Sequence, residues 1–143
     1  MRKRLLKILV TGGAGFIGSA FTGLAVKKGY NVIVVDKLTY AGDLRRLESV
    51  KGRYKFYKTD ICDIIQIEQI FKKDKPQIVA NFSAETHVDR SIQDASPFIE
   101  TNVKGTQVLL DASKKYQVER FIHLSSDEVY GDIKNGKFSE EAP

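Results

Sequence analysis

Ser126, Asp127 and Glu128 place a hydroxyl group beside two consecutive carboxyl groups. Two carboxyl groups crowded together out of water do not ionise equally, because burial and mutual repulsion raise the pKa of one of them. One group can then remain protonated and donate a proton while the other accepts one, which is the arrangement that general acid–base catalysis needs. A pair of solvated acids in a surface turn is the alternative, and position alone does not separate these two interpretations.

Three glycines, at positions 12, 15 and 18, follow a short apolar run and precede an amphipathic segment. This pattern of strand, tight turn and helix N-terminus is typical of dinucleotide-binding proteins. Gly12 permits the sharp turn, Gly15 lets the backbone approach a phosphate, and Gly18 lets the helix pack closely on the strand. The first amides of that helix, at Phe16 and Ile17, lack intrahelical acceptors and lie at the positive end of its dipole, so they can bind a pyrophosphate.

Asp36 ends the next apolar run, residues 31–35, about 20 residues after the glycine series. A carboxylate at this place accepts hydrogen bonds from ribose hydroxyl groups and repels the additional 2′-phosphate of NADP. The sequence therefore favours NAD as the cofactor. The alternative for Asp36 is a capping or surface role without a ligand.

Residues 83–91 are richer in polar groups than a simple connection needs, and they follow the fourth predicted strand. Ligands of open α/β sheets bind outside the carboxyl ends of the strands, where the strand order reverses. We therefore expect this segment to be a loop on the same edge as the glycines. His87 within it is more often a surface or structural residue than a ligand contact, and His123 is interpreted as structural.

Strands are predicted for the run that opens at Lys7 and for residues 31–35, 53–58, 77–82 and 120–125, each followed or preceded by a segment with helical spacing. Strands that alternate with helices predict an α/β fold with a parallel sheet and right-handed crossovers. The expected architecture is a Rossmann-type doubly wound sheet with strand order 3-2-1-4-5.

The predicted helices differ in their apolar faces. The first presents Phe16, Phe21 and Leu24 at helical spacing, and another is capped by Asp63. A long helix over residues 97–116 is apolar over a wide arc, which predicts burial both against the sheet and against a partner subunit.

Composition narrows the class of protein. The 143 residues predict one domain, and no apolar run approaches the roughly 20 residues that span a bilayer, so no membrane association is expected. Cys62 is the single cysteine, which excludes an internal disulfide and a four-cysteine zinc site and fits a reducing cytoplasm. The net charge of +5 comes from scattered Lys and Arg residues, so no nucleic-acid partner and no metal are expected.

Four motifs together resemble the dTDP-glucose 4,6-dehydratases of the extended short-chain dehydrogenase/reductase superfamily. They are the glycine series and residues 36–42, 84–92 and 126–131. The resemblance extends over essentially the whole chain. Within the superfamily the Asp127–Glu128 pair discriminates, because sugar-nucleotide 4-epimerases lack the pair and UDP-glucuronate decarboxylases usually keep the glutamate alone.

The resemblance implies a role for each matching residue. In the family's mechanism NAD takes a hydride from C4 of the glucose ring, Glu128 removes the C5 proton, Asp127 protonates the departing C6 hydroxyl, and the hydride returns to C6. Asp127, Glu128 and Ser126 are the implied catalytic residues, and Thr86 and Ser126 are the implied contacts to the sugar. The implied contacts to NAD are Gly12, Gly15, Phe16, Ile17, Gly18, Asp36, Lys37, Leu38, Thr39, Asp60, Ile61, Phe82, Ser83, Ala84, Glu85, Thr86 and Thr101.

Two features of the family are not found in the sequence. The family oxidises its substrate with a Tyr-x-x-x-Lys pair, and the one such spacing here, Tyr130 to Lys134, falls in a predicted loop. The sugar-nucleotide domain that follows in the family is also missing. We therefore expect residues 1–143 to be an incomplete NAD-binding domain, truncated before the last strands, that binds NAD weakly and turns over no substrate alone. The resemblance implies a homodimer for the full-length protein.

Two other functions stay open at this point. One is a different sugar-nucleotide enzyme of the same superfamily, such as an epimerase or a decarboxylase. The other is a non-catalytic NAD-binding module that acts as a sensor or partner.

Overall fold

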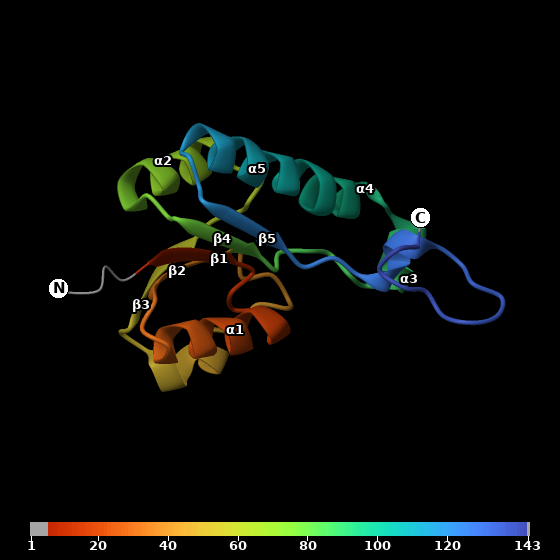
Figure 1. Cartoon of the computed structure of the whole chain (residues 1–143), viewed down its shortest axis with the longest axis horizontal. Coiled ribbons are helices and arrows are strands. Elements are labelled where there is room, and N and C mark those ends of the chain that lie inside the picture. The colour runs from red at the N-terminus through yellow and green to blue at the C-terminus, as the bar shows by residue number, and fades with distance from the viewer. Residues whose placement is uncertain (1–5, 143) are drawn as a thin grey trace.

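The computed structural model describes residues 6–142 and has a parallel sheet of five strands at its centre. The strand order is β3-β2-β1-β4-β5, which confirms the predicted doubly wound arrangement (Figure 1). The strands are β1 (Lys7–Thr11), β2 (Asn31–Asp36), β3 (Tyr54–Lys58), β4 (Ile78–Asn81) and β5 (Arg120–His123). Because β1 pairs with both β2 and β4, the order reverses beside β1, and this point is where such sheets bind ligands.

Helices cover both faces of the sheet. The α-helices are α1 (Phe16–Lys27), α2 (Ile64–Asp74), α3 (Val88–Gln93), α4 (Ser96–Phe98) and α5 (Thr106–Lys115). Two 3₁₀-helical segments are η1 (Leu44–Val50) and η3 (Asp127–Tyr130), and η2 (Ile99–Gly105) is a π-helix. In Figure 1, α1 lies on one face of the sheet, and α2 and α5 lie on the other.

Two separate apolar clusters fill the space between these layers, because successive strand residues point to opposite faces. Val10 packs on the side of α1 and η1 with Leu47, whereas Leu9 packs on the side of α2 and α5 with Phe71 and Leu109. The near-continuous apolar sequence of β2 follows from the same geometry, since its residues 32–36 are all buried.

The face of α1 that packs on the sheet agrees only in part with the predicted one, since Phe21 packs against the apolar cluster on this side of the sheet. Phe16 and Leu24 are exposed, and the buried positions of the helix are Gly18, Ser19, Thr22, Ala25 and Val26. Small residues allow a close approach of helix and strand, and this approach, together with the packing of Phe21 and Val26, sets the position of α1.

Two other expectations are corrected. Residues 88–91, predicted as part of a loop, belong to α3, whose residues are all partly or fully exposed. Its apolar residues Val88 and Ile92 are exposed, so the sequence showed no buried helix face here. The long helix predicted over 97–116 is interrupted by the π-helical segment η2. Val108, Leu109 and Ala112 are buried on the side of the sheet, whereas Ile99 and Val103 are exposed, and their burial against a partner subunit stays a prediction.

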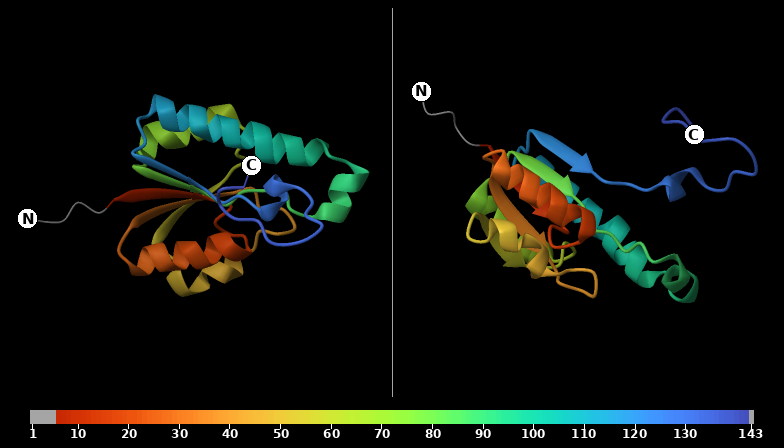
Figure 2. Two further views of the ribbon diagram at one scale, coloured as in Figure 1. Left: turned by 45° about the vertical axis from the view of Figure 1, so that its right-hand side comes forward. Right: turned by 90° about the horizontal axis from the view of Figure 1, so that it is seen from below.

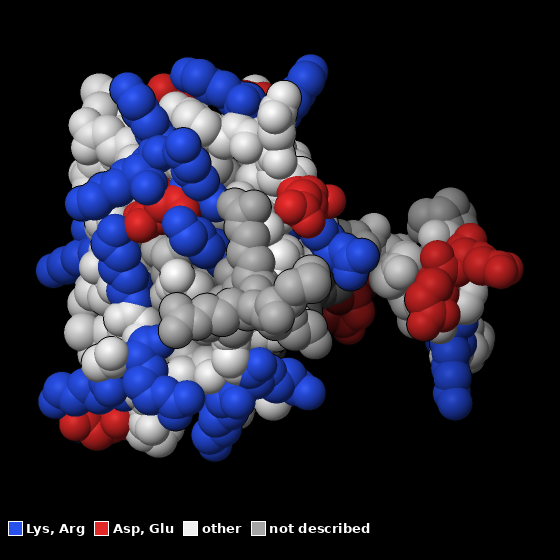
Figure 3. Space-filling view, turned by 60° about the vertical axis from the view of Figure 1, so that its left-hand side comes forward, with Lys and Arg blue, Asp and Glu red and all other residues white. Residues whose placement is uncertain are grey.

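Lysine residues gather at the amino ends of the strands, on the side of the sheet away from the glycine turn. The last turns of α1, α2 and α5 carry Lys27, Lys72, Lys73, Lys114 and Lys115, where cations are favoured by the helix dipole. The face in Figure 3 shows many Lys and Arg residues with few acidic ones among them. Much of the net positive charge is therefore explained by helix ends. Within residues 6–142, no helix is both long and apolar enough to cross a membrane.

The chain after β5 leaves the sheet. The amide of Leu124 still donates to the carbonyl of Asn81 at 3.1 Å, and beyond it the chain runs through η3 and projects away from the strands (Figure 2). Within this segment the rings of Tyr130 and Phe138 stack with their centroids 5.2 Å apart.

Candidate functional site

A cleft lies at the carboxyl ends of β1, β2, β3 and β4, at the point where the strand order reverses. Its lining consists of Gly12, Gly15, Asp36, Lys37, Thr39, Ala41, Gly42, Thr59, Asp60, Ile61, Phe82, Ser83, Ala84, Glu85 and Thr101. Residues from five separate stretches of the sequence thus meet in one place. Most of the predicted cofactor contacts are among them.

The glycine turn is held in a conformation that larger residues would not fit. Gly12 has a φ of +65°, and a Cβ there would lie 2.7 Å from the backbone of Phe82 and Ser83. A Cβ at Gly18 would lie 2.1 Å from the carbonyl oxygen of Gly12. The amide of Gly15 donates to that same oxygen at 3.0 Å. These close contacts leave the cleft floor formed by bare backbone, which is the surface that a phosphate needs.

The N-terminus of α1 opens at this turn. Gly15 occupies the N-cap position, and no side chain donates or accepts a capping hydrogen bond there. Phe16 and Ile17 are 82% and 55% exposed, so the side chains at the start of α1 are not packed in the core. The first amides of a helix have no intrahelical acceptor, and an anion can therefore take them.

Asp36 is fixed between the two loops that flank the cleft. Its side chain is buried, with the residue 8% exposed, which excludes the surface role considered from the sequence. One carboxylate oxygen accepts from the amide of Ala14 at 2.9 Å, and the other accepts from the amide of Leu38 at 2.8 Å. Each oxygen has about two acceptor sites, so both can accept a further hydrogen bond from a ribose hydroxyl.

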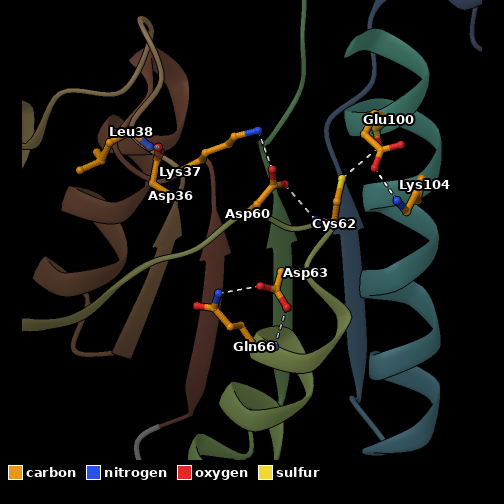
Figure 4. A network of polar contacts seen from close by, with 9 residues as sticks. All are labelled: Asp36, Lys37, Leu38, Asp60, Cys62, Asp63, Gln66, Glu100 and Lys104. Atoms are coloured by element: carbon orange, nitrogen blue, oxygen red, sulfur yellow. Dashed lines mark hydrogen bonds and ion pairs between the residues drawn. The ribbon is translucent and has the colours of Figure 1, made fainter. Parts of the chain in front are cut away.

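An ion pair joins β2 to the segment after β3. Lys37 Nζ lies 2.5 Å from Asp60 Oδ2, and Asp60 Oδ1 accepts from the amide of Cys62 at 3.0 Å (Figure 4). Partial burial acts to raise the pKa of Asp60, but the hydrogen bonds from Lys37 and Cys62 outweigh it, and the pKa lies below its ordinary value. The hydrogen bond to Asp60 likewise raises the pKa of Lys37. Both groups are therefore charged at neutral pH.

The same network continues to the π-helical segment. The thiol of Cys62 donates to the carbonyl oxygen of Glu100 at 3.1 Å, and Lys104 pairs with the Glu100 carboxylate (Figure 4). Gly105 packs so tightly on Ile61 that a Cβ there would lie 2.5 Å from the Ile61 side chain. These contacts fix η2 against the loop after β3. Thr101, which belongs to η2, is held in the cleft lining as a result.

Asn81 anchors the wall of the cleft that follows β4. This buried side chain accepts from the hydroxyl of Thr11 at 2.6 Å and from the amide of Ser83 at 3.1 Å through its oxygen. Its nitrogen lies 3.1 Å from His123 Nδ1, so an Asn81 donor requires His123 to accept at that atom. His123 therefore has the structural contact expected from the sequence. The ends of β1, β4 and β5 are joined by this one side chain.

Five predicted cofactor contacts do not contribute to the cleft lining. They are Phe16, Ile17, Gly18, Leu38 and Thr86. Phe16, Leu38 and Thr86 directly adjoin lining residues, Ile17 and Gly18 lie further along α1, and Thr86 is exposed on the segment that leads to α3. Conversely, the lining includes Ala41, Gly42 and Thr59, which were not among the predicted cofactor contacts. The sequence did carry a signal for them, since Ala41 and Gly42 belong to the motif over residues 36–42 and Thr59 precedes Asp60 at the end of the third predicted strand.

The predicted catalytic residues lie outside the cleft. Ser126, Asp127 and Glu128 are exposed, and the two acids open η3 on the segment that projects from the sheet. His87 is also exposed and precedes α3 without capping it through its side chain. The acid pair is exposed to solvent in this structure, and its catalytic role stays a prediction.

The cleft fits a dinucleotide by its own features. It combines a backbone cradle that a Cβ would fill, a helix N-terminus without a side-chain cap, and a buried carboxylate with acceptor capacity to spare. The sequence model of the family described as GDP-mannose 4,6 dehydratase matches residues 9–143.

The chain belongs to this GDP-mannose 4,6 dehydratase family.

Several members of known name are similar to the chain. The dTDP-glucose 4,6-dehydratase of Streptomyces niveus is 44% identical over 96% of the chain and 43% of its own length, and that of Escherichia coli is 48% identical over 90% and 39%. The chain therefore spans less than half the length of these relatives. Their identity confirms the resemblance to the dTDP-glucose 4,6-dehydratases.

Solved structures extend the comparison to the fold. The dTDP-glucose 4,6-dehydratase DesIV of Streptomyces venezuelae, with NAD and TYD bound, superposes with a TM-score of 0.89 at 43% identity, covering 96% of the chain and 45% of DesIV. A UDP-glucose 4-epimerase of Thermus thermophilus, in complex with NAD, gives a TM-score of 0.85 at 32% identity over 95% and 43%. The fold is therefore shared by dehydratases and epimerases, and both of these relatives are NAD complexes.

Proposed function

We propose that this member of the GDP-mannose 4,6 dehydratase family binds NAD in the cleft between β1 and β4. The observation that carries the proposal is the position of Asp36, whose buried carboxylate is held by the amides of Ala14 and Leu38 at the edge of the glycine turn. Backbone amides of Phe16 and Ile17 bind the pyrophosphate, and Asp36 accepts from the adenosine ribose. Asp60 and Ile61 flank the adenine.

Asp36 also determines the choice between NAD and NADP. A 2′-phosphate would bring at least one negative charge next to a carboxylate that is 8% exposed, where repulsion is poorly screened. Lys37 does not offset this charge, because its ammonium is already paired with Asp60. NAD is therefore the preferred cofactor.

The proposed reaction is the dehydration of dTDP-glucose to dTDP-4-keto-6-deoxyglucose. Bound NAD supplies temporary storage for the hydride that leaves C4 and returns to C6, so it is regenerated in each turnover. Glu128 removes the proton at C5, which the C4 ketone has made acidic, and Asp127 protonates the C6 hydroxyl as it departs as water. Thr86 and Ser126 contact the sugar. The identity of 43–48% to dTDP-glucose 4,6-dehydratases supports this substrate.

We further propose that residues 1–143 alone turn over no substrate. Asp127 and Glu128 stand in solvent on the segment after β5, outside the cleft that holds the cofactor. A proton-transfer group must lie within hydrogen-bond reach of the atom it serves, and an exposed segment does not impose that position.

Calorimetric titration with NAD and NADP tests the cofactor assignment. Clear binding of NAD and at least tenfold weaker binding of NADP is the expected result. Binding of NADP that equals or exceeds that of NAD would remove the role assigned to Asp36.

A chimera tests the reaction. Residues 1–143 would replace the matching segment of the Streptomyces niveus dTDP-glucose 4,6-dehydratase, and the product would be identified by NMR. The chimera is expected to form dTDP-4-keto-6-deoxyglucose, and Glu128→Gln is expected to abolish the exchange of the C5 proton with solvent. A Glu119→Gln chimera, changed at an exposed acid before β5, serves as the matched control.

Epimerisation of a sugar nucleotide is the second candidate, because UDP-glucose 4-epimerases share the fold with TM-scores of 0.83–0.90. Epimerases of the superfamily lack the acid pair that this chain has at Asp127 and Glu128. A product that keeps its C6 hydroxyl and differs from the substrate only at C4 would favour the epimerase.

A further inference from the structure

One set of side chains joins two segments that both contribute to the lining of the cleft. The hydroxyl of Tyr40 donates to Glu85 Oε2 at 3.3 Å, and the guanidinium of Arg90 lies over the Tyr40 ring, 4.2 Å from its centroid. We call Tyr40, Glu85 and Arg90 the clasp. Tyr40 belongs to the loop after β2, Glu85 to the segment after β4, and Arg90 to α3.

The loop after β2 is shaped so that Tyr40 stands at its tip. Leu38 has a φ of +56°, a left-handed conformation that is uncommon for a bulky residue, and its amide is held by Asp36. The amide of Gly42 then donates to the carbonyl of Thr39 at 3.1 Å and closes a tight turn around Tyr40. The Tyr40 side chain is directed away from the core, since the residue is 59% exposed. The left-handed conformation of Leu38 is unfavourable for a bulky residue, and the contact between Tyr40 and Glu85 helps to compensate for it.

The opposite wall is fixed independently of Tyr40. The amide of Glu85 donates to Asn102 Oδ1 at 2.8 Å, and Asn102 Nδ2 donates back to the Glu85 carbonyl at 2.9 Å. Asn102 lies in η2 beside Thr101, which lines the cleft. The backbone of Glu85 is thus tied to η2. The clasp therefore joins two walls that are each held in place by other contacts.

Both walls line the same cleft. Thr39, Ala41 and Gly42 come from the loop that carries Tyr40, and Ser83, Ala84 and Glu85 come from the segment that the clasp reaches. A dinucleotide that lies along the carboxyl ends of the strands has to pass between these walls.

We propose that the clasp retains the bound dinucleotide and that Tyr40 and Arg90 are positioning residues of the cofactor cleft. This inference rests on the proposed binding of NAD. Both clasp contacts are made at the surface, where a hydrogen bond and a cation–π contact are each weak. The clasp consequently opens often, and it slows release of the dinucleotide without preventing it.

The test compares release rates of NADH, followed by its fluorescence in stopped-flow displacement with excess NAD. Tyr40→Phe keeps the ring over Arg90 and removes the hydroxyl, and Arg90→Gln removes the cation and keeps Tyr40. Each variant is expected to release NADH about three to ten times faster than the wild-type chain, with an association rate within about twofold. Tyr116→Phe is the matched control, because its ring packs on Phe71 outside the cleft, and its release rate is expected to be unchanged.

Each outcome has a distinct meaning. Wild-type binding of NADH with unchanged release from both clasp variants would overturn the clasp and leave the proposed cofactor intact. No binding by the wild-type chain would overturn the proposed cofactor. In that case hydrogen–deuterium exchange of the ligand-free chain tests whether the clasp couples the two walls. Faster exchange in both 38–42 and 83–87 of Tyr40→Phe supports the coupling of the walls, and faster exchange in one segment or neither overturns it.

Discussion

Replacement of Gly18 by alanine tests whether the close approach of α1 to the glycine turn builds the site. A Cβ at Gly18 would lie 2.1 Å from the carbonyl oxygen of Gly12 and 3.1 Å from the Cα of Gly13. An ordinary contact between non-bonded atoms is about 3.5 Å, so the overlap with Gly12 exceeds roughly 1 Å. The atoms it meets belong to the backbone and not to a flexible side chain, so the N-terminus of α1 has to move.

The size of the effect follows from two opposing contributions. Forcing a methyl group into a packed site costs about 1–3 kcal/mol, whereas alanine in place of glycine inside a helix contributes about 0.5–1 kcal/mol of stability. The net expectation is a loss of about 1–2 kcal/mol in the free energy of unfolding, or roughly 3–8 °C in melting temperature. Gly23 provides the matched control, because it lies in the same helix and a Cβ there meets nothing within 4 Å. Gly23→Ala is expected to gain about 0.5–1 kcal/mol.

Urea denaturation and calorimetric titration with NAD measure both consequences. Gly18→Ala is expected to weaken NAD binding by about tenfold or more, because a displaced helix N-terminus loses charge-assisted hydrogen bonds worth about 1.5–3 kcal/mol. Gly23→Ala is expected to bind NAD like the wild type. A Gly18→Ala variant as stable as Gly23→Ala, with wild-type affinity for NAD, would refute the argument from close approach.

Three further predictions concern charged and ionisable groups of the cleft. Asp36→Asn places an amide nitrogen against one of two backbone donors, so it is expected to lower stability by about 1–3 kcal/mol and to reduce the preference for NAD over NADP, as measured by denaturation and titration. Burial raises the pKa of Cys62 from 9.0 to about 11, so the thiolate fraction at pH 8 falls about a hundredfold and alkylation by iodoacetamide is expected to slow in proportion. In urea the unfolded chain should react at the ordinary rate of a free thiol. Equal alkylation rates with and without urea would contradict the effect of burial. Folding lowers the pKa of Asp60, because the hydrogen bonds from Lys37 and the Cys62 amide outweigh the opposing effect of burial. The ionised Asp60 carboxylate therefore stabilises the fold above about pH 4, and this stabilisation is lost as the pH falls through the folded-state pKa. Urea denaturation at pH 7 and pH 3 should accordingly show a smaller loss for Asp60→Asn than for the wild type.

Most of the fold was predictable because its signals are local. The apolar run ending at Asp36 has the composition of a strand buried on both faces, and Asp63 caps α2 by accepting from the amide of Gln66 at 3.0 Å, as expected from the sequence. What escaped prediction depends on contacts distant in sequence. In the π-helical segment Gly105 packs on Ile61, and the Glu100 carbonyl accepts from the Cys62 thiol. The spacing of apolar residues along the helix predicts neither contact.

The candidate site likewise contains residues that the sequence predicts and contacts that it does not predict. Residues at the carboxyl ends of strands, such as Gly12, Asp36 and Asp60, were predictable because the topology of a parallel sheet brings those ends together. The clasp was not, since Tyr40 and Arg90 are far apart in sequence and their meeting depends on the left-handed turn at Leu38. The helix α3 that carries Arg90 was predicted as a loop for the related reason that it buries no apolar face.

The most direct test of the NAD cleft is an NMR titration of the ¹⁵N-labelled chain with NAD. The account predicts the largest shifts of amide resonances at Gly15, Phe16 and Ile17, where the pyrophosphate binds, and at Leu38, whose amide shares Asp36 with the ribose. The same titration with NADP should produce smaller shifts at these positions. Shifts that leave Gly15, Phe16 and Ile17 unaffected, or that are equal for both dinucleotides at Leu38, would contradict the binding of NAD in this cleft.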